Sequence, residues 1–168
     1  MEQTTQGVPV PVSAELLRTH WQGHRNLTRR VIEAFPADQL FSFSIGGMRP
    51  FSDLALELLD IAEEGIVGFV TDQWVPSSEL KHISGVGKPQ TKEELLAYWD
   101  KVTNDIDAQW PALTAARFGE TAVVFGQYEQ TVFEALQYFV DNENHHRGQG
   151  YVYLRALGIE PPFFWDRP

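Results

Sequence analysis

The sequence contains no cysteine among its 168 residues. Disulfide bonds, thiolate zinc sites and a cysteine nucleophile are therefore excluded, and the composition favours a cytoplasmic protein. Long hydrophobic runs are also missing, since none approaches the roughly 20 apolar residues that a membrane-spanning helix needs. The N-terminal residues lack the basic stretch and the apolar stretch that together mark a signal peptide.

Positive charge is scarce as well. The chain has 13 Lys and Arg against 23 Asp and Glu, which gives a formal net charge of −10. A surface this acidic repels the phosphates of nucleic acids and the headgroups of anionic lipids. We therefore expect neither nucleic acid nor a membrane as a partner.

Apolar residues recur with helical periodicity in four long segments. The first segment follows Ser13, which can cap a helix, and stops before Pro36. The third opens on a capping box formed by Thr91 and Glu94. Gly158 ends the last one. The sequence thus predicts helices over residues 13–35, 52–70, 91–110 and 128–157, with Pro50 as an alternative first residue of the second.

The connections between these helices are long. Residues 38–50 are rich in aromatic residues and glycine, and residues 72–90 form a connection of a length that is usually functional or poorly ordered. Residues 1–12 have no periodicity and are expected to form a flexible tail before a single domain, residues 13–168. We predict an all-α protein, a four-helix bundle with long ordered connections.

The last predicted helix carries polar residues on its inward face. Asn142 and His146 are one turn apart on a row that also holds Phe139 and Tyr153, so both should project into one pocket of the bundle. Gly150, one turn further along, lets a neighbouring helix or a ligand come close.

Residues 141–159, with the sequence DNENHHRGQGYVYLRALGI, are similar to the closing helix of the DinB/YfiT-like superfamily. That helix carries the motif His-x-x-His-His-Arg-Gly-Gln followed by Tyr-x-Tyr-Leu-Arg-x-Leu-Gly. A His-Trp pair at residues 20–21 and a Gly-Met-Arg turn at residues 47–49 also fit the family. The resemblance covers the chain beyond its tail and implies a DinB-type bundle with up-down-down-up or related topology.

In that family, three histidines hold a divalent metal in the bundle core, one from the second helix and two from the last. Members include metal-dependent transferases and isomerases that use low-molecular-weight thiols, and many are homodimers. The family name refers to induction by DNA damage, not to contact with DNA. The resemblance implies a divalent metal (Zn, Ni, Mn or Mg), a small-molecule or thiol ligand and a homodimer.

Matched residue by residue, His146 corresponds to the second of the two histidines on the last helix. Asn142 stands where the first would be, and Glu57 is the polar residue nearest to the position of the second-helix histidine. A ligand set of His146, Asn142 and Glu57 would offer harder donor atoms. Such a set binds Zn or Ni more weakly and accepts Mg or Mn more readily.

Glu57 also has a simpler interpretation. Asp53, Glu57, Asp60 and Glu64 recur on one strip of the second helix, largely opposite its apolar row. Such a strip is typical of a solvated acidic face. The sequence leaves both interpretations of Glu57 open.

The first helix supplies a second candidate set. His20 and His24 lie one turn apart on an otherwise apolar stripe, and two imidazoles at that spacing can hold a metal. Facing His146 across the core, they would form the alternative set His20, His24 and His146. We therefore expect a polar pocket of His20, His24, Glu57, Asn142 and His146, with or without a metal.

Two functions follow from these observations. The first is a metal-dependent transferase or hydrolase-like enzyme, with the metal held by His146 and acting as a Lewis acid on water or on a thiol cosubstrate. The second is a non-catalytic bundle that has lost its metal site and serves as a small-ligand binder or a dimeric stress-response protein.

Overall fold

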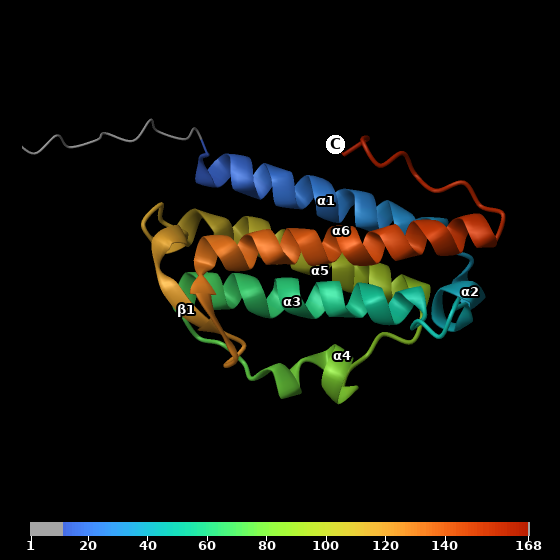
Figure 1. The fold of residues 1–168 in the computed structure, drawn as a ribbon, viewed down its shortest axis with the longest axis horizontal. Coiled ribbons are helices and arrows are strands. Elements are labelled where there is room, and N and C mark those ends of the chain that lie inside the picture. The colour runs from blue at the N-terminus through green and yellow to red at the C-terminus, as the bar shows by residue number, and fades with distance from the viewer. Residues whose placement is uncertain (1–11, 168) are drawn as a thin grey trace, which may run out of the picture.

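The computed structural model describes residues 12–167, and four long helices dominate it (Figure 1). Three of them begin at side-chain caps, where Ser13 accepts the N–H of Leu16, Thr91 that of Glu94 and Thr131 that of Glu134. The long helices are α1 (Ala14–Ala34), α3 (Phe51–Thr71), α5 (Lys92–Gln109) and α6 (Val132–Ala156). They confirm the predicted four-helix bundle.

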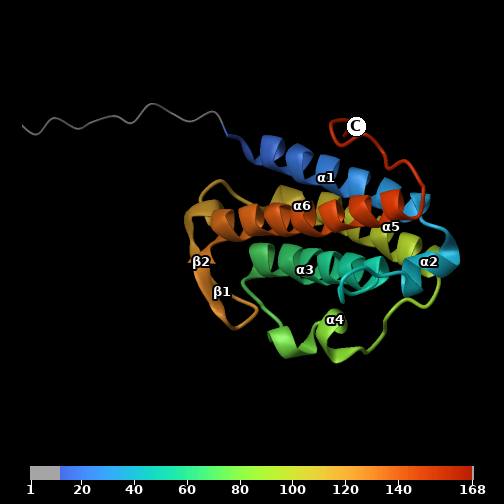
Figure 2. The ribbon, with the colours of Figure 1, turned by 45° about the vertical axis from the view of Figure 1, so that its right-hand side comes forward.

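The helices follow an up-down-down-up order. Helices α1 and α3 each pack against both α5 and α6. Helices α3 and α5 run in the same direction, because the chain returns along the bundle between them (Figure 1). The returning segment carries two short helices, η1 (Ser77–Glu79) and α4 (Lys81–Ser84), and lies against α3 (Figure 2).

Large apolar side chains from all four helices form the core. The ring of Phe139 on α6 stacks on Phe69 of α3, with ring centroids 5.2 Å apart, and Phe35 stacks on Phe51 at 4.9 Å. Close approach of α6 to α3 depends on Gly150, because a side-chain carbon at that position would overlap the ring of Phe51. This contact sets the α3–α6 interface where the polar site lies.

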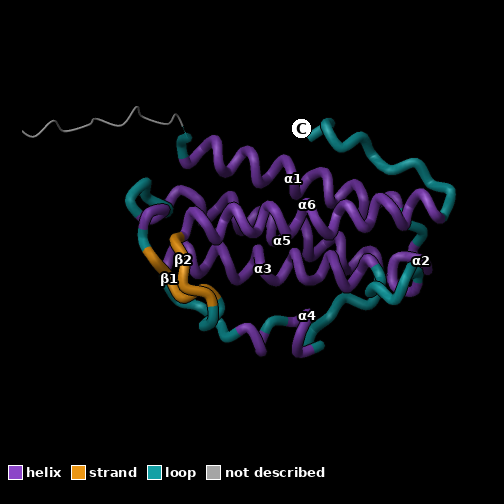
Figure 3. The backbone as a smooth tube through the Cα atoms, viewed as in Figure 1, coloured by secondary structure: helices purple, strands orange, loops and turns teal. Residues whose placement is uncertain are grey.

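A β-hairpin precedes α6, and the sequence did not predict it (Figure 3). Strand β1 (Thr121–Val124) pairs antiparallel with β2 (Tyr128–Thr131). Phe125 and Gly126 adopt positive φ in the turn, which allows the chain to reverse. Helix α6 therefore begins at residue 132 rather than 128, behind a capping box of Thr131 and Glu134.

The connections contain more local structure than expected. Segment 38–50 includes most of a short helix, α2 (Ala37–Ser42), and two 3-10 turns, η2 (Trp110–Ala112) and η3 (Arg117–Gly119), follow α5. The predicted tail, residues 1–12, lies outside the described residues except for its last member. Among residues 12–167, no helix combines the length and the hydropathy that crossing a bilayer requires.

Candidate functional site

The structure brings Glu57, Asn142 and His146 together at the α3–α6 interface. Nε2 of His146 lies 3.0 Å from Oε1 of Glu57, and the amide of Asn142 donates to the same oxygen at 3.4 Å. Asn142 and His146 are buried, and Glu57 is half-buried. One turn of α6 thus presents an amide and an imidazole to one carboxylate of α3.

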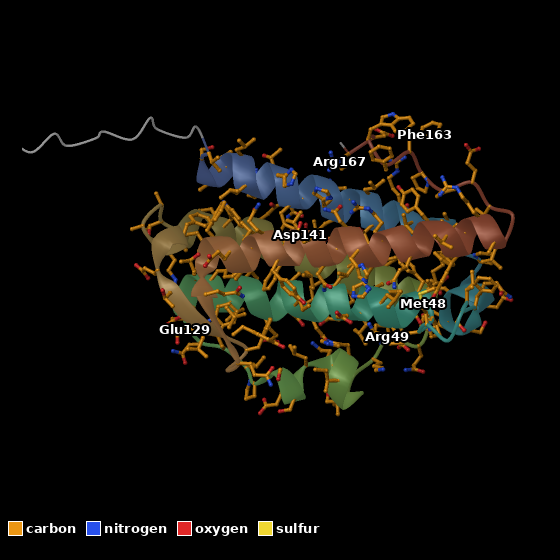
Figure 4. The ribbon with its side chains drawn as sticks, viewed as in Figure 1. Met48, Arg49, Glu129, Asp141, Phe163 and Arg167 are labelled. Carbon is orange, nitrogen blue, oxygen red and sulfur yellow. The ribbon has the colours of Figure 1, made fainter. Side chains whose placement is uncertain are left out.

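Two further residues complete this network. The guanidinium of Arg49 donates to Oε2 of Glu57 at 2.6 Å, and Nδ1 of His146 lies 2.8 Å from Oε1 of Gln149. Met48 and Arg49 lie just before the first turn of α3 (Figure 4), and the hydroxyl of Tyr153 on α6 donates to the backbone carbonyl of Arg49 at 3.0 Å. Both ring nitrogens of His146 therefore have an oxygen partner within hydrogen-bond distance. We call Arg49, Glu57, Asn142, His146 and Gln149 the interface network.

The network keeps Glu57 ionised. Burial raises the pKa of this carboxyl, but hydrogen bonds from His146 and Arg49 lower it by more, to about 2. At neutral pH Glu57 is therefore a carboxylate, paired on each oxygen with a donor.

These residues do not fit the family's metal. The resemblance implies three imidazoles, but the chain has one imidazole, one carboxylate and one amide at this site. Within residues 12–167, no group of three His, Cys, Asp or Glu side chains is placed to hold a metal ion. The positive charge of Arg49, ion-paired to Glu57, also opposes a divalent cation there. Both nitrogens of His146 already face other partners.

His20 and His24 do not join this site, contrary to the prediction of a shared pocket. His20 is exposed, and His24 is buried on the other side of α6. Its Nδ1 lies 3.0 Å from a guanidinium nitrogen of Arg147, and its Nε2 lies 2.8 Å from one of Arg167. Arg147 and His146 are adjacent on α6 and therefore about 100° apart around its axis, so they face different helices.

A cavity of about 270 Å³ opens beside the interface network, between α3, α6, the hairpin and the η1–α4 segment. Glu57 forms part of its wall, and most of the remaining wall is apolar or aromatic. The lining side chains are Glu57, Ile61, Ser77, Leu80, His82, Ile83, Val124, Phe125, Tyr128, Gln130, Tyr138 and Phe139. We call this space the side cavity.

Sequence reasoning missed His82, which lies in the side-cavity wall. Oδ2 of Asp60 accepts the backbone N–H of His82 at 2.5 Å and lies 2.9 Å from its Nδ1. Asp60 is buried, so the acidic strip on α3 is not the solvated face that its periodicity suggested. The η1–α4 segment covers it, and Lys81 pairs with Glu63 there. The length of the 72–90 connection was the only sequence signal for this site.

Comparison with known proteins agrees with this architecture. The DinB family model matches residues 1–166. A DinB-like protein from Bacillus cereus is 17% identical, with a TM-score of 0.69, and the match covers 89% of this chain and 95% of that one. A DinB-like protein from Bacillus subtilis, YjoA, is 21% identical, with a TM-score of 0.68. That match covers 88% of this chain and 96% of the other. No curated protein matches the chain. By the extent of the family match, the chain belongs to the DinB family.

Proposed function

We propose that this chain is a DinB-family protein that binds a small organic molecule in the side cavity without a metal. The observation that carries the proposal is the position of Glu57. Its carboxylate forms part of the cavity wall and is at the same time bound by Arg49 and His146. The polar end of the cavity is thus an ion-paired network at the residues where the resemblance implies a metal.

The composition of the wall defines the ligand class. Phe125, Phe139, Tyr128 and Tyr138 provide aromatic surface, and aromatic side chains prefer to stack on or meet the edges of other rings. The few polar groups of the wall can orient such a ligand, as in most small-molecule sites. A small aromatic molecule with one or two polar groups fits this wall best.

The family's metal-dependent transferase chemistry has weaker support. The proximity of Glu57, Asn142 and His146 favours it, because a carboxylate, an amide oxygen and an imidazole can each bind a cation. The ion pair between Arg49 and Glu57 opposes it, since a cation would have to displace a guanidinium.

The proposal can be tested by ligand-observed NMR with 2-naphthol, a compact aromatic alcohol. Gln130→Trp should fill the side cavity, because Gln130 lies in its wall. Glu129→Trp is the matched control, since the neighbouring residue of β2 is exposed and points to the opposite face of the hairpin.

We expect 2-naphthol to bind the wild type and the Glu129→Trp variant, in metal-free buffer with a chelator, and to bind Gln130→Trp at least about tenfold more weakly. Binding that is absent from the wild type, or that Gln130→Trp leaves unchanged, would show that the side cavity is not the ligand site.

A further inference from the structure

His82 is held in one orientation by a buried carboxylate. Asp60 is 1% exposed, and a single oxygen of its side chain lies within hydrogen-bond distance of both the backbone nitrogen and Nδ1 of His82. The other carboxylate oxygen has no hydrogen bond in the described structure, with Lys81 3.8 Å away. The charge of Asp60 is therefore directed at this imidazole and at one lysine.

This arrangement fixes which ring nitrogen carries the proton. A carboxylate beside Nδ1 favours the tautomer in which Nδ1 donates, and the lone pair then lies on Nε2. Nε2 has no hydrogen-bond partner within residues 12–167, and the ring forms part of the wall of the side cavity. An oriented imidazole with a free lone pair beside a cavity is the arrangement of a general base.

Residues with hydrogen-bond donors line the same space. Tyr128, Gln130 and Tyr138 belong to the cavity wall, and their side chains carry two hydroxyls and one amide. Such donors can bind a carbonyl oxygen and stabilise the negative charge that develops on it during attack.

We infer that the side cavity hydrolyses a small carboxylic ester, with His82 as the general base and Asp60 as its positioning residue. This inference rests on the proposed ligand site. A water molecule attacks the carbonyl carbon while one of its protons moves to Nε2 of His82. The bond between that carbon and the alcohol oxygen then breaks, and the departing oxygen takes the proton from Nε2. The products are a carboxylic acid and an alcohol, and His82 returns to its starting state.

A purely structural role makes a different prediction. Asp60 also binds the backbone of α4, so its carboxylate could serve only to anchor the connection to α3. In that case the His82 side chain could be replaced without loss of any activity, provided that the backbone contact remains.

The test measures release of 2-naphthol from 2-naphthyl acetate by fluorescence. The variants are His82→Gln, Asp60→Asn and, as matched control, His145→Gln, because His145 is exposed on α6 and is not one of the residues that line the cavity. We expect His82→Gln to lower kcat at least about 100-fold with little change in KM. Asp60→Asn should lower kcat while 2-naphthol binds as tightly as to the wild type, and His145→Gln should retain the wild-type rate.

Hydrolysis by the wild type no faster than by free imidazole at equal histidine concentration would overturn the inference. A His82→Gln variant with the wild-type rate would do the same. If 2-naphthol still binds in either case, the ligand site stands and only the chemistry fails. If 2-naphthol does not bind at all, the proposed function fails first.

Discussion

Nε2 of His146 lies 3.0 Å from Oε1 of Glu57, across the interface between α6 and α3. By the resemblance to the DinB pattern, His146 on α6 matches one of its three histidines, and Glu57 on α3 is the polar residue nearest to the position of another. An ion-pair network can thus hold the two helices together at the positions where the DinB pattern implies metal ligands.

Replacing His146 should destabilise the protein. His146→Ala removes the imidazole from the half-buried carboxylate of Glu57 and leaves Oε1 with only the 3.4 Å contact from Asn142. Losing a hydrogen bond to a charged group costs about 1–3 kcal/mol in the free energy of unfolding. Urea denaturation measures this loss. His145→Ala is the control, because the neighbouring imidazole is exposed and should cost less than about 0.5 kcal/mol. Equal losses in the two variants would show that the network contributes nothing specific.

Two glycines of α6 should respond in opposite ways to alanine. Gly150→Ala should lower stability by about 1–3 kcal/mol, because the new methyl group overlaps the buried ring of Phe51, which is itself stacked on Phe35. Gly148 has open space around it, so Gly148→Ala should raise stability by about 0.5–1 kcal/mol through helix propensity. Thermal denaturation of both variants checks the sign of each change. A tolerated Gly150→Ala would contradict the close approach of α6 to α3.

His24 should make stability depend on pH. Burial first, and then the positive charges of Arg147, His20 and Arg167, lower the pKa of His24 from 6.5 to about 3 in the folded chain. Above pH 6.5 the imidazole is neutral in both states and contributes nothing. As the pH falls below 6.5, His24 binds a proton in the unfolded chain but stays neutral in the folded chain, so the free energy of unfolding decreases.

The size of this effect is measurable by urea denaturation at several pH values. Between about pH 6.5 and pH 5 we expect the free energy of unfolding of the wild type to fall by roughly 1–2 kcal/mol through His24. The free energy of unfolding of His24→Gln should change less with pH over the same range. Glu57, with its pKa lowered to about 2, loses its stabilising contribution only below its ordinary value of 4.5 and does not interfere. In His145→Gln, the free energy of unfolding should depend on pH as it does in the wild type. A His24→Gln variant as pH-dependent as the wild type would refute the assignment.

Local signals made the helices predictable. Apolar periodicity and the caps at Ser13 and Thr91 lie within single segments, so the sequence located α1 and α5 to within one or two residues. The hairpin was missed because residues 128–131 are mostly polar and run directly into the periodic pattern of α6. Only the pairing of β2 with β1, which is a contact between separate segments, makes these residues a strand.

The site was predictable only in part, for a similar reason. Helical spacing placed Asn142 and His146 on one side of α6, and the structure brings Glu57 to them. Spacing could not tell which neighbouring helix each side of α6 meets, so His24 was assigned to the wrong side. The pair of Asp60 and His82 joins a helix to a distant connection, and no periodicity relates the two. The homodimer and the cytoplasmic location stay predictions.

The most direct test of the account is metal binding by the wild type and by the double variant Glu57→His/Asn142→His. The double variant restores three imidazoles at the α3–α6 interface, since the two new side chains would join His146. After equilibrium dialysis against Zn²⁺ or Ni²⁺ and elemental analysis, the double variant should hold about one ion per chain. The wild type should hold far less than one. A wild-type protein that retains one ion per chain, and loses it in His146→Ala, would contradict the claim that an ion-pair network has taken the place of the metal.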